Sequence, residues 1–135
     1  GFGIWSAEFT QGYTPGMTGM DRWIDWEKEN FIGQAAAIKE RDGNGPAQKL
    51  VMLEIDAEDA DASGYEPVWN NDSLVGFVTS GGYGHTLKKS LAMALVNNDL
   101  AQEDQKLKVH VVGVEKDATV IQASPYDPEG SVMRV

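Results

Sequence analysis

Val78–Val96 has the sequence "VTSGGYGHTLKKSLAMALV" and gives the clearest indication of secondary structure in the chain. Its second half alternates strictly, because Leu91, Met93 and Leu95 fall on one side of an extended chain and Ala92, Ala94 and Val96 fall on the other. This period of two is typical of a β-strand. Small residues on one face favour a narrow barrel interior or a crowded bend. We therefore expect a strand, a turn at Gly81–Gly82 and a second strand.

Further alternating segments surround this stretch on both sides. They are residues 49–56, 74–80, 106–116 and 118–123, with turn-forming residues between them. Several short strands at this spacing indicate a mainly β protein, either a sandwich or a barrel. Residues 1–30 are rich in glycine and aromatic side chains and predict extended segments and turns. Residues 30–42 predict a helix with Asn30 as its cap and Gly43 at its end.

Composition narrows the function classes. The 135 residues carry a formal charge of −10, which argues against nucleic acid and anionic membrane surfaces as partners. No apolar run approaches the ~20 residues of a membrane span. The absence of cysteine excludes disulfides, thiolate metal sites and a cysteine nucleophile, and it fits a reducing compartment.

The motifs that could carry chemistry are incomplete. A phosphate-binding loop would need glycine where Lys88 stands. His85 could act as a base toward Ser80 or Ser90, but the sequence lacks a nucleophile elbow, and a histidine that bonds backbone in a turn is favoured. The acidic segment "DADASG" (59–64) begins like a calcium loop but lacks its closing glutamate, so we interpret it as a solvated loop with no metal site. The residues alone favour a structural or partner-binding module.

Several motifs, in order, resemble one family. The segment "GFVTSGGYGHTLKKSLAMALV" is similar to the strand, turn and strand of the C-terminal barrel in the glycine cleavage T-protein (aminomethyltransferase) family. Four further segments resemble the same region: "TPGMTGMDRWIDWEKENFIGQAA" (14–36), "QKLVMLEID" (48–56), "EPVW" (66–69) and "SPYDPEGSVMRV" (124–135). The segment 124–135 is most similar to dimethylglycine and sarcosine dehydrogenase relatives. Two departures from the family pattern are Met17 in place of a glutamate and Gln34–Ala35 in place of Arg-Glu.

The resemblance implies a Greek-key-like antiparallel β-barrel over residues 46–135. It implies that residues 1–45 are the tail of a preceding folate-binding domain, against which Trp5, Trp23 and Trp26 would pack. It also implies a tetrahydrofolate-dependent aminomethyl- or methyltransferase whose catalytic residues lie in domains before this segment. The expected compartment is the cytoplasm, or the mitochondrial matrix in a eukaryote.

Within that family, the barrel would shape the folate cleft without catalysing the reaction itself. Tyr83, His85 and Tyr126 are the candidate cofactor-facing residues, and the competing interpretation is that they serve turn and surface packing. The alternative hypothesis is a stand-alone β-barrel that binds a protein partner through its acidic face and aromatic N-terminal segment, with no folate role.

Overall fold

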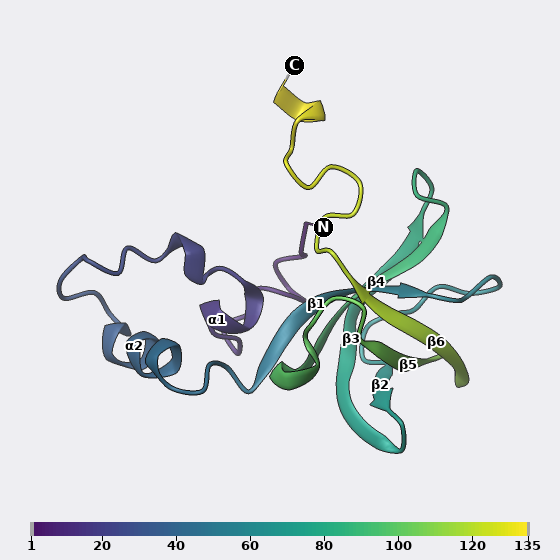
Figure 1. The fold of residues 1–135 in the computed structure, drawn as a ribbon, viewed down its shortest axis with the longest axis horizontal. Helices are drawn as coiled ribbons and strands as arrows, with labels where there is room; N and C mark the ends of the chain where they lie inside the picture. Colours follow the sequence, from purple (N-terminus) through teal and green to yellow (C-terminus); the bar gives the residue numbers. More distant parts are fainter. Residues whose placement is uncertain (1, 135) are drawn as a thin grey trace.

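The computed structural model describes residues 2–134 and shows a six-stranded closed β-barrel (Figure 1). The strands are β1 (Gln48–Ile55), β2 (Pro67–Asn70), β3 (Ser73–Gly84), β4 (Lys89–Asn97), β5 (Lys106–Val111) and β6 (Val114–Ile121). The N-terminal residues form turns and short helices to one side of the barrel, and the residues after β6 extend away from it. The prediction of a mainly β fold is confirmed.

The strand order is that of a Greek key. Around the barrel the strands run β1-β4-β3-β2-β5-β6, and every neighbouring pair is antiparallel. Strands β2, β3 and β4 follow one another as hairpins, and β5 returns to lie beside β2, which defines the motif. Strand β1 closes the barrel by pairing with both β4 and β6. The expected Greek-key-like antiparallel barrel is therefore present.

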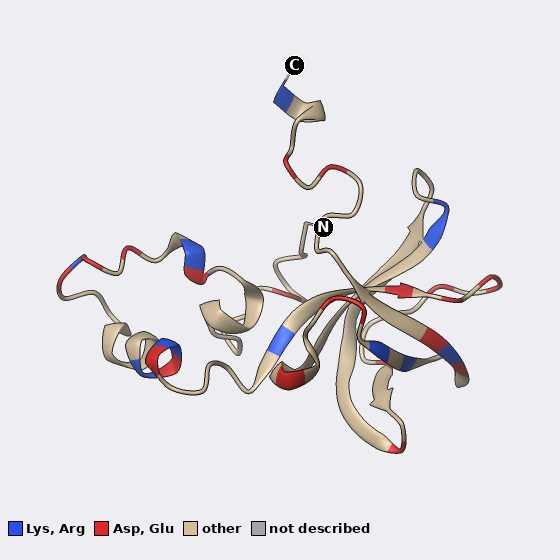
Figure 2. Cartoon of the chain, viewed as in Figure 1, with Lys and Arg blue, Asp and Glu red and all other residues tan. Residues whose placement is uncertain are grey.

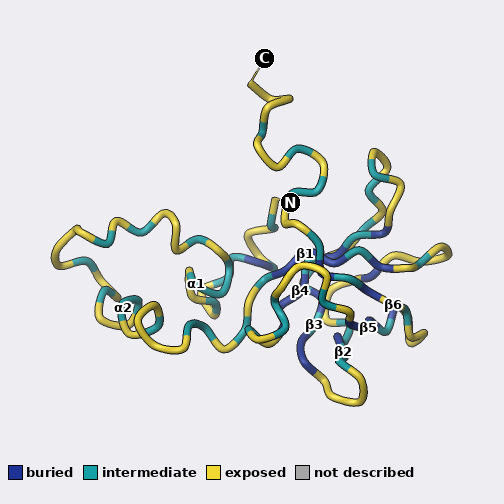
Figure 3. Tube along the Cα trace, in the orientation of Figure 1, coloured by how far each residue is buried: buried dark blue, intermediate teal, exposed yellow. Residues whose placement is uncertain are grey.

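The barrel interior is filled by the alternating residues that the sequence singled out. Ala92, Ala94 and Val96 belong to the core cluster, in which Leu53 and Val68 are fully buried. Figure 3 shows that the buried residues lie mainly along the barrel strands. Leu53 pairs in register with Ala92 on one side and with Val120 on the other. Small alanines on β4 therefore make room for larger side chains from the neighbouring strands, which is how a small barrel reaches native packing density.

The outer face of β1 and β4 is also covered. Leu95 has no exposed surface and Met52 is only 7% exposed, although both lie outside the main core cluster. Gly3 and Phe9 of the N-terminal segment line a cavity together with Met52 and Met93, so this segment lies against the barrel wall. Strict alternation of buried and exposed residues consequently fails on these two strands.

Glu8 anchors that segment to β3. Its side chain is fully buried, and one carboxylate oxygen accepts a hydrogen bond from the Ser80 hydroxyl at 2.6 Å. The other oxygen accepts from the Ile4 amide at 2.5 Å. Burial raises the pKa of Glu8, but the hydrogen bonds from Ser80, Thr79 and the backbone together outweigh burial, so its pKa lies below the ordinary value.

This lowered pKa predicts acid release of the N-terminal segment. The stability that Glu8 contributes is complete above its ordinary pKa of 4.5 and is lost as the pH falls through the lower folded value. An NMR titration of the Glu8 carboxyl carbon should give a midpoint below 4.5, with the amide shifts of residues 2–10 changing in the same step. A midpoint at or above that value would contradict the anchoring role.

Gly81 and Gly82 do not form the turn that was predicted for them within Val78–Val96. Gly81 and Gly82 lie inside β3, and the turn occupies residues 85–88, with Lys88 at φ 55°. A Cβ on Gly81 would lie 2.2 Å from the carbonyl oxygen of Ala62, which belongs to the acidic loop packed along this strand. The glycine at 81 therefore permits a close backbone approach, a use of glycine in strands that local sequence does not reveal.

The β5–β6 hairpin also differs from its predicted boundaries. The segment expected as one strand over residues 106–116 is broken by a two-residue turn at Val112 and Gly113, whose φ angles of 50° and 79° match a type I′ turn. A β-branched residue rarely adopts this conformation, so the sequence signals no turn here. The Val112 amide donates to the Glu66 carboxylate at 2.7 Å, which helps to hold the turn.

Replacing Val112 with asparagine should stabilise the barrel by about 1 kcal/mol, because asparagine tolerates the left-handed conformation and Asn-Gly is the preferred type I′ pair. Val112 is 74% exposed, so no packing is lost, and its backbone bond to Glu66 remains. Chemical denaturation should show the gain, with Val114→Asn as a neighbouring control. Equal or lower stability of Val112→Asn would contradict the described turn.

The helical elements lie mainly before the barrel. They are α1 (Pro15–Thr18), η1 (Asp21–Trp23), α2 (Gln34–Asp42), η2 (Asn98–Leu100) and η3 (Val132–Arg134). Helix α2 ends before Gly43 as predicted, but it begins at Gln34 after Gly33 and is not capped by Asn30, whose φ is 58°. A side-chain hydrogen bond from Thr14 to Glu40 joins α1 to α2. Among the described residues, no helix has the length and apolar character to cross a membrane.

Candidate functional site

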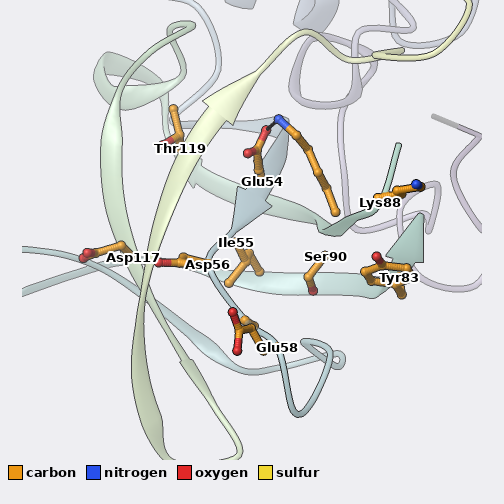
Figure 4. A pocket seen from close by; sticks show the side chains of 11 residues that line it. Glu54, Ile55, Asp56, Glu58, Tyr83, Lys88, Ser90, Asp117 and Thr119 are labelled. Atoms are coloured by element: carbon orange, nitrogen blue, oxygen red, sulfur yellow. Dashed lines mark hydrogen bonds and ion pairs between the residues drawn. The ribbon is translucent and has the colours of Figure 1, made fainter. Parts of the chain in front are cut away.

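A polar cavity of about 600 Å³ lies at one end of the barrel (Figure 4). Three elements form it: the end of β1 with the residues that follow, the β3–β4 hairpin and strand β6. Tyr83 of the hairpin, a candidate residue from the sequence, lines this cavity. The closed barrel thus brings one predicted site residue beside side chains that are far from it in the chain.

Charge is divided across the cavity. Tyr83 and Lys88 lie on one side in Figure 4, and Asp56 and Asp117 lie on the other. Lys89 bridges the two strands by an ion pair with Glu54 at 2.5 Å. The acidic residues of the barrel are concentrated on its loops and strand ends, as Figure 2 shows. The lysine and tyrosine side of the cavity suits an anionic or aromatic group, and the carboxylate side suits a cation.

The acidic loop is tied to β4 beside the cavity by a hydrogen bond. Ser90 is almost fully buried, and its hydroxyl donates to Asp61 at 2.7 Å. Asp61 belongs to the "DADASG" segment, so this carboxylate already has a structural partner. Within residues 2–134, the side chains form no group of three or more histidine or acidic residues that could hold a metal ion.

The three candidate cofactor-facing residues do not form one cluster. Tyr83 and His85 contact each other edge to face, with ring centroids 5.1 Å apart, at the tip of the β3–β4 hairpin. Tyr126 lies in the segment after β6, which extends away from the barrel in Figure 1, and it is 61% exposed. Across the described part of the chain, no aromatic contact or hydrogen bond joins Tyr126 to the other two.

His85 does not act as a hydrogen-bond partner of Ser80 or Ser90 in the structure. His85 lies in the turn over residues 85–88, and its ring contacts Tyr83 edge to face, so its place in a turn is confirmed while a hydrogen bond from its ring to backbone stays a prediction. The Ser80 hydroxyl donates to Glu8, and the Ser90 hydroxyl donates to Asp61, so both hydroxyls point to carboxylates. This arrangement holds loops against the barrel and provides no base for a serine nucleophile.

Sequence reasoning missed most of the cavity wall. Glu54 and Lys89 are 35 residues apart and become neighbours only because β1 pairs with β4. One signal was available, since Glu54 interrupts the apolar pattern of a strand and Lys89 begins another. An alternating pattern shows on which face a side chain lies, but not which strand lies beside it.

The sequence of the barrel matches a family model. Residues 48–127 match the "Glycine cleavage T-protein C-terminal barrel domain", and this range contains all six strands. The chain belongs to this family. The resemblance seen in the sequence motifs is thereby confirmed.

Relatives of this barrel family agree with the assignment. The chain is 33% identical to human mitochondrial dimethylglycine dehydrogenase over 122 residues, covering 90% of this chain and 14% of the relative. It is 31% identical to an aminomethyltransferase of Desulfitobacterium hafniense strain DCB-2 over 127 residues, covering 94% of this chain and 34% of the relative. The chain therefore spans between one seventh and about one third of these relatives.

A solved structure shares the fold of the barrel. The glycine cleavage system aminomethyltransferase T from Bartonella henselae superposes with a TM-score of 0.78 at 22% identity. The match covers 87% of this chain and 33% of that protein. At this identity the likeness establishes the fold, and the chemistry must be argued from the residues of this chain.

Proposed function

We propose that this chain is the C-terminal barrel of a tetrahydrofolate-dependent aminomethyl- or methyltransferase, in which it supports the folate cleft and does not catalyse transfer by itself. Residues 1–45 would be the tail of the preceding folate-binding domain, and residues 46–135 would be the barrel. The observation that carries the proposal is the family match over residues 48–127, in a chain that spans 34% or less of the relatives described above. A protein of this family would act in the cytoplasm, or in the mitochondrial matrix of a eukaryote.

The cavity fits one part of a folate molecule. When bound, tetrahydrofolate supplies the nitrogen that accepts the one-carbon unit. Its aromatic rings suit the exposed ring of Tyr83, which is 44% exposed beside the cavity, and its carboxylates suit Lys88. The opposite wall, with Glu58 and Asp117, would repel those carboxylates. The fit is therefore to the hairpin side alone, which supports a barrel that forms one wall of a cleft completed by other domains.

In this proposal the hairpin residues bind and orient. Tyr83 would pack against the cofactor, with His85 holding its ring by the edge-to-face contact. Lys88 would offset negative charge, and Tyr126 would approach from the exposed segment after β6. Within residues 2–134 these side chains make no hydrogen bond to a group that could exchange a proton with them, so in this proposal the barrel contributes shape and charge to the cleft.

Binding of tetrahydrofolate to the full-length polypeptide tests the proposal. Tyr83→Ala should raise the dissociation constant roughly two- to tenfold, the range expected for one aromatic contact. Tyr65→Ala, which removes another exposed tyrosine, should leave it unchanged. Calorimetry would check both, and unchanged binding by Tyr83→Ala would remove Tyr83 from the cleft.

A second candidate function is a stand-alone interaction module without a folate role. The observation that favours it is the number of large apolar side chains on the surface, including Trp5, Trp23 and Tyr65, which are each at least 75% exposed. Such residues are typical of protein interfaces. The same calorimetry separates the two functions, because the module would leave the full-length polypeptide unable to bind tetrahydrofolate.

A further inference from the structure

One region of the surface combines large apolar side chains with an absence of charge. Phe2 is 87% exposed, Ile4 53% and Trp5 78%. Phe2 and Ile4 border a groove of about 220 Å³ whose other lining residues come from β1, β3 and β4, and none of them is ionisable. We call Phe2, Ile4, Trp5 and this groove the N-terminal apolar patch. An uncharged patch is notable in a chain with 11 basic and 21 acidic residues, and such patches commonly mark interfaces.

Glu8 holds the backbone of this patch in place through hydrogen bonds to Ile4 and Ser80. The backbone folds into a tight turn in which the amides of Ala7 and Glu8 donate to the Ile4 carbonyl. The Glu8 carboxylate completes the turn by accepting from the Ile4 amide, and it ties the turn to β3 by accepting from Ser80. Because the carboxylate is fully buried, it exposes no ionised atom at the patch surface.

The anchor joins positions 72 residues apart in the chain. A buried carboxylate is retained only where hydrogen bonds compensate its lost hydration, so it favours one arrangement of its donors over all others. The bond to Ser80 therefore defines where the N-terminal turn crosses the barrel. It also defines the direction in which Phe2 and Trp5 project.

We infer that Glu8 is a positioning residue that presents the N-terminal apolar patch to the part of the same polypeptide that precedes this chain. The inference rests on the proposed function, because the occupant is the folate-binding part implied by relatives of which this chain covers 14% to 34%. Phe2, the first residue that the structure describes, borders the groove, and the lack of charge there suits an apolar partner surface.

Oxidative footprinting of the full-length polypeptide tests the patch. Trp5 should be oxidised at least fivefold more slowly than Tyr65, which is 88% exposed and lies outside the patch. Equal oxidation of the two side chains would overturn the docking of the patch. Tetrahydrofolate binding is measured separately on the same sample. Absent binding would contradict the proposed function, whereas the rate of Trp5 oxidation reports only whether the patch is docked.

Variants of Glu8 test its positioning role in the same polypeptide. Glu8→Leu should raise the oxidation of Trp5 at least threefold, since no acceptor remains for Ile4 and Ser80. Glu8→Gln keeps an acceptor oxygen and should restore most of the protection, whereas Glu129→Gln, an exposed control, should change nothing. Ser80→Ala should act in the same direction as Glu8→Leu.

Circular dichroism distinguishes positioning from general unfolding. We expect Glu8→Leu to retain the β-sheet signal while Trp5 becomes accessible to oxidation. Unchanged Trp5 oxidation in Glu8→Leu would overturn the role of Glu8. Oxidation of Trp5 and of the core residue Leu53 in parallel would also overturn it, because that result indicates loss of the barrel.

Discussion

Alanine at position 76 is expected to destabilise the barrel by about 3 kcal/mol and to lower its melting temperature by at least about 10 °C. Gly76 is buried in β3, in register with Val96 of β4. A Cβ there would lie 2.0 Å from the Leu95 carbonyl oxygen and 2.9 Å from the Val96 Cα, and both atoms belong to backbone. Backbone cannot rotate away as a side chain can, so β3 and β4 must separate locally.

Two further glycines of β3 test whether the cost depends on the atoms that surround each glycine. Gly81→Ala should also destabilise, since its Cβ would meet the Ala62 carbonyl oxygen at 2.2 Å. Gly82→Ala should stay within about 0.5 kcal/mol of the parent, because no heavy atom lies within 4 Å of its Cβ. Thermal unfolding followed by circular dichroism measures all three. Equal effects at 81 and 82 would mean that the acidic loop does not pack on β3.

Truncation of Leu53 is the second large effect, with an expected loss of 2–5 kcal/mol, the range for a buried leucine replaced by alanine. Leu53 has no exposed surface and lies in β1 between Ala92 of β4 and Val120 of β6. Its neighbour in register on β4 is already an alanine, so the interior has no large side chain there to fill the space. The cavity should therefore persist and the cost should lie in the upper part of that range.

Leu74→Ala is the matched control for Leu53→Ala, since Leu74 is 60% exposed on β3. It should change the free energy of unfolding by no more than about 0.5 kcal/mol. Urea denaturation gives both values on one scale. A loss of less than about 1 kcal/mol in the free energy of unfolding of Leu53→Ala would show that β1 does not pack tightly against β4 and β6.

The strands with clear alternation could be predicted from the sequence. The alternating run from Leu91 to Val96 identified β4 and its small interior side, and the run from Val51 to Ile55 identified β1. Both are strands of the closed barrel, in which the inward face must be apolar. The four-residue strand β2 was not predicted, because Pro67 and its short length give no periodic signal.

The remaining differences arise from contacts that local sequence does not encode. Gly81 was interpreted as a turn residue, whereas the approach of Ala62 from the acidic loop requires glycine there. Val112 conceals a turn because its conformation is supported by the distant carboxylate of Glu66. Met52 is buried by the N-terminal segment, which alternation within β1 cannot indicate.

The candidate site was only partly predictable. Tyr83 and His85 were cofactor-facing candidates on the basis of the family resemblance, and they contact each other at the tip of the hairpin. The cavity beside them depends on the pairing of β1 with β4 and β6, which brings Glu54 and Asp117 to the same end of the barrel. The role of Glu8 was not predicted, since one glutamate in an irregular segment resembles any solvated charge.

We propose that this barrel completes a folate-dependent transferase whose chemistry lies elsewhere in the polypeptide. Single-turnover transfer of a one-carbon unit to tetrahydrofolate tests it most directly, in the full-length polypeptide and in the 135-residue chain. We expect transfer by the full-length polypeptide with an amine donor and none by the 135-residue chain. Transfer by the chain alone, or a full-length polypeptide that neither binds tetrahydrofolate nor transfers to it, would contradict the claim.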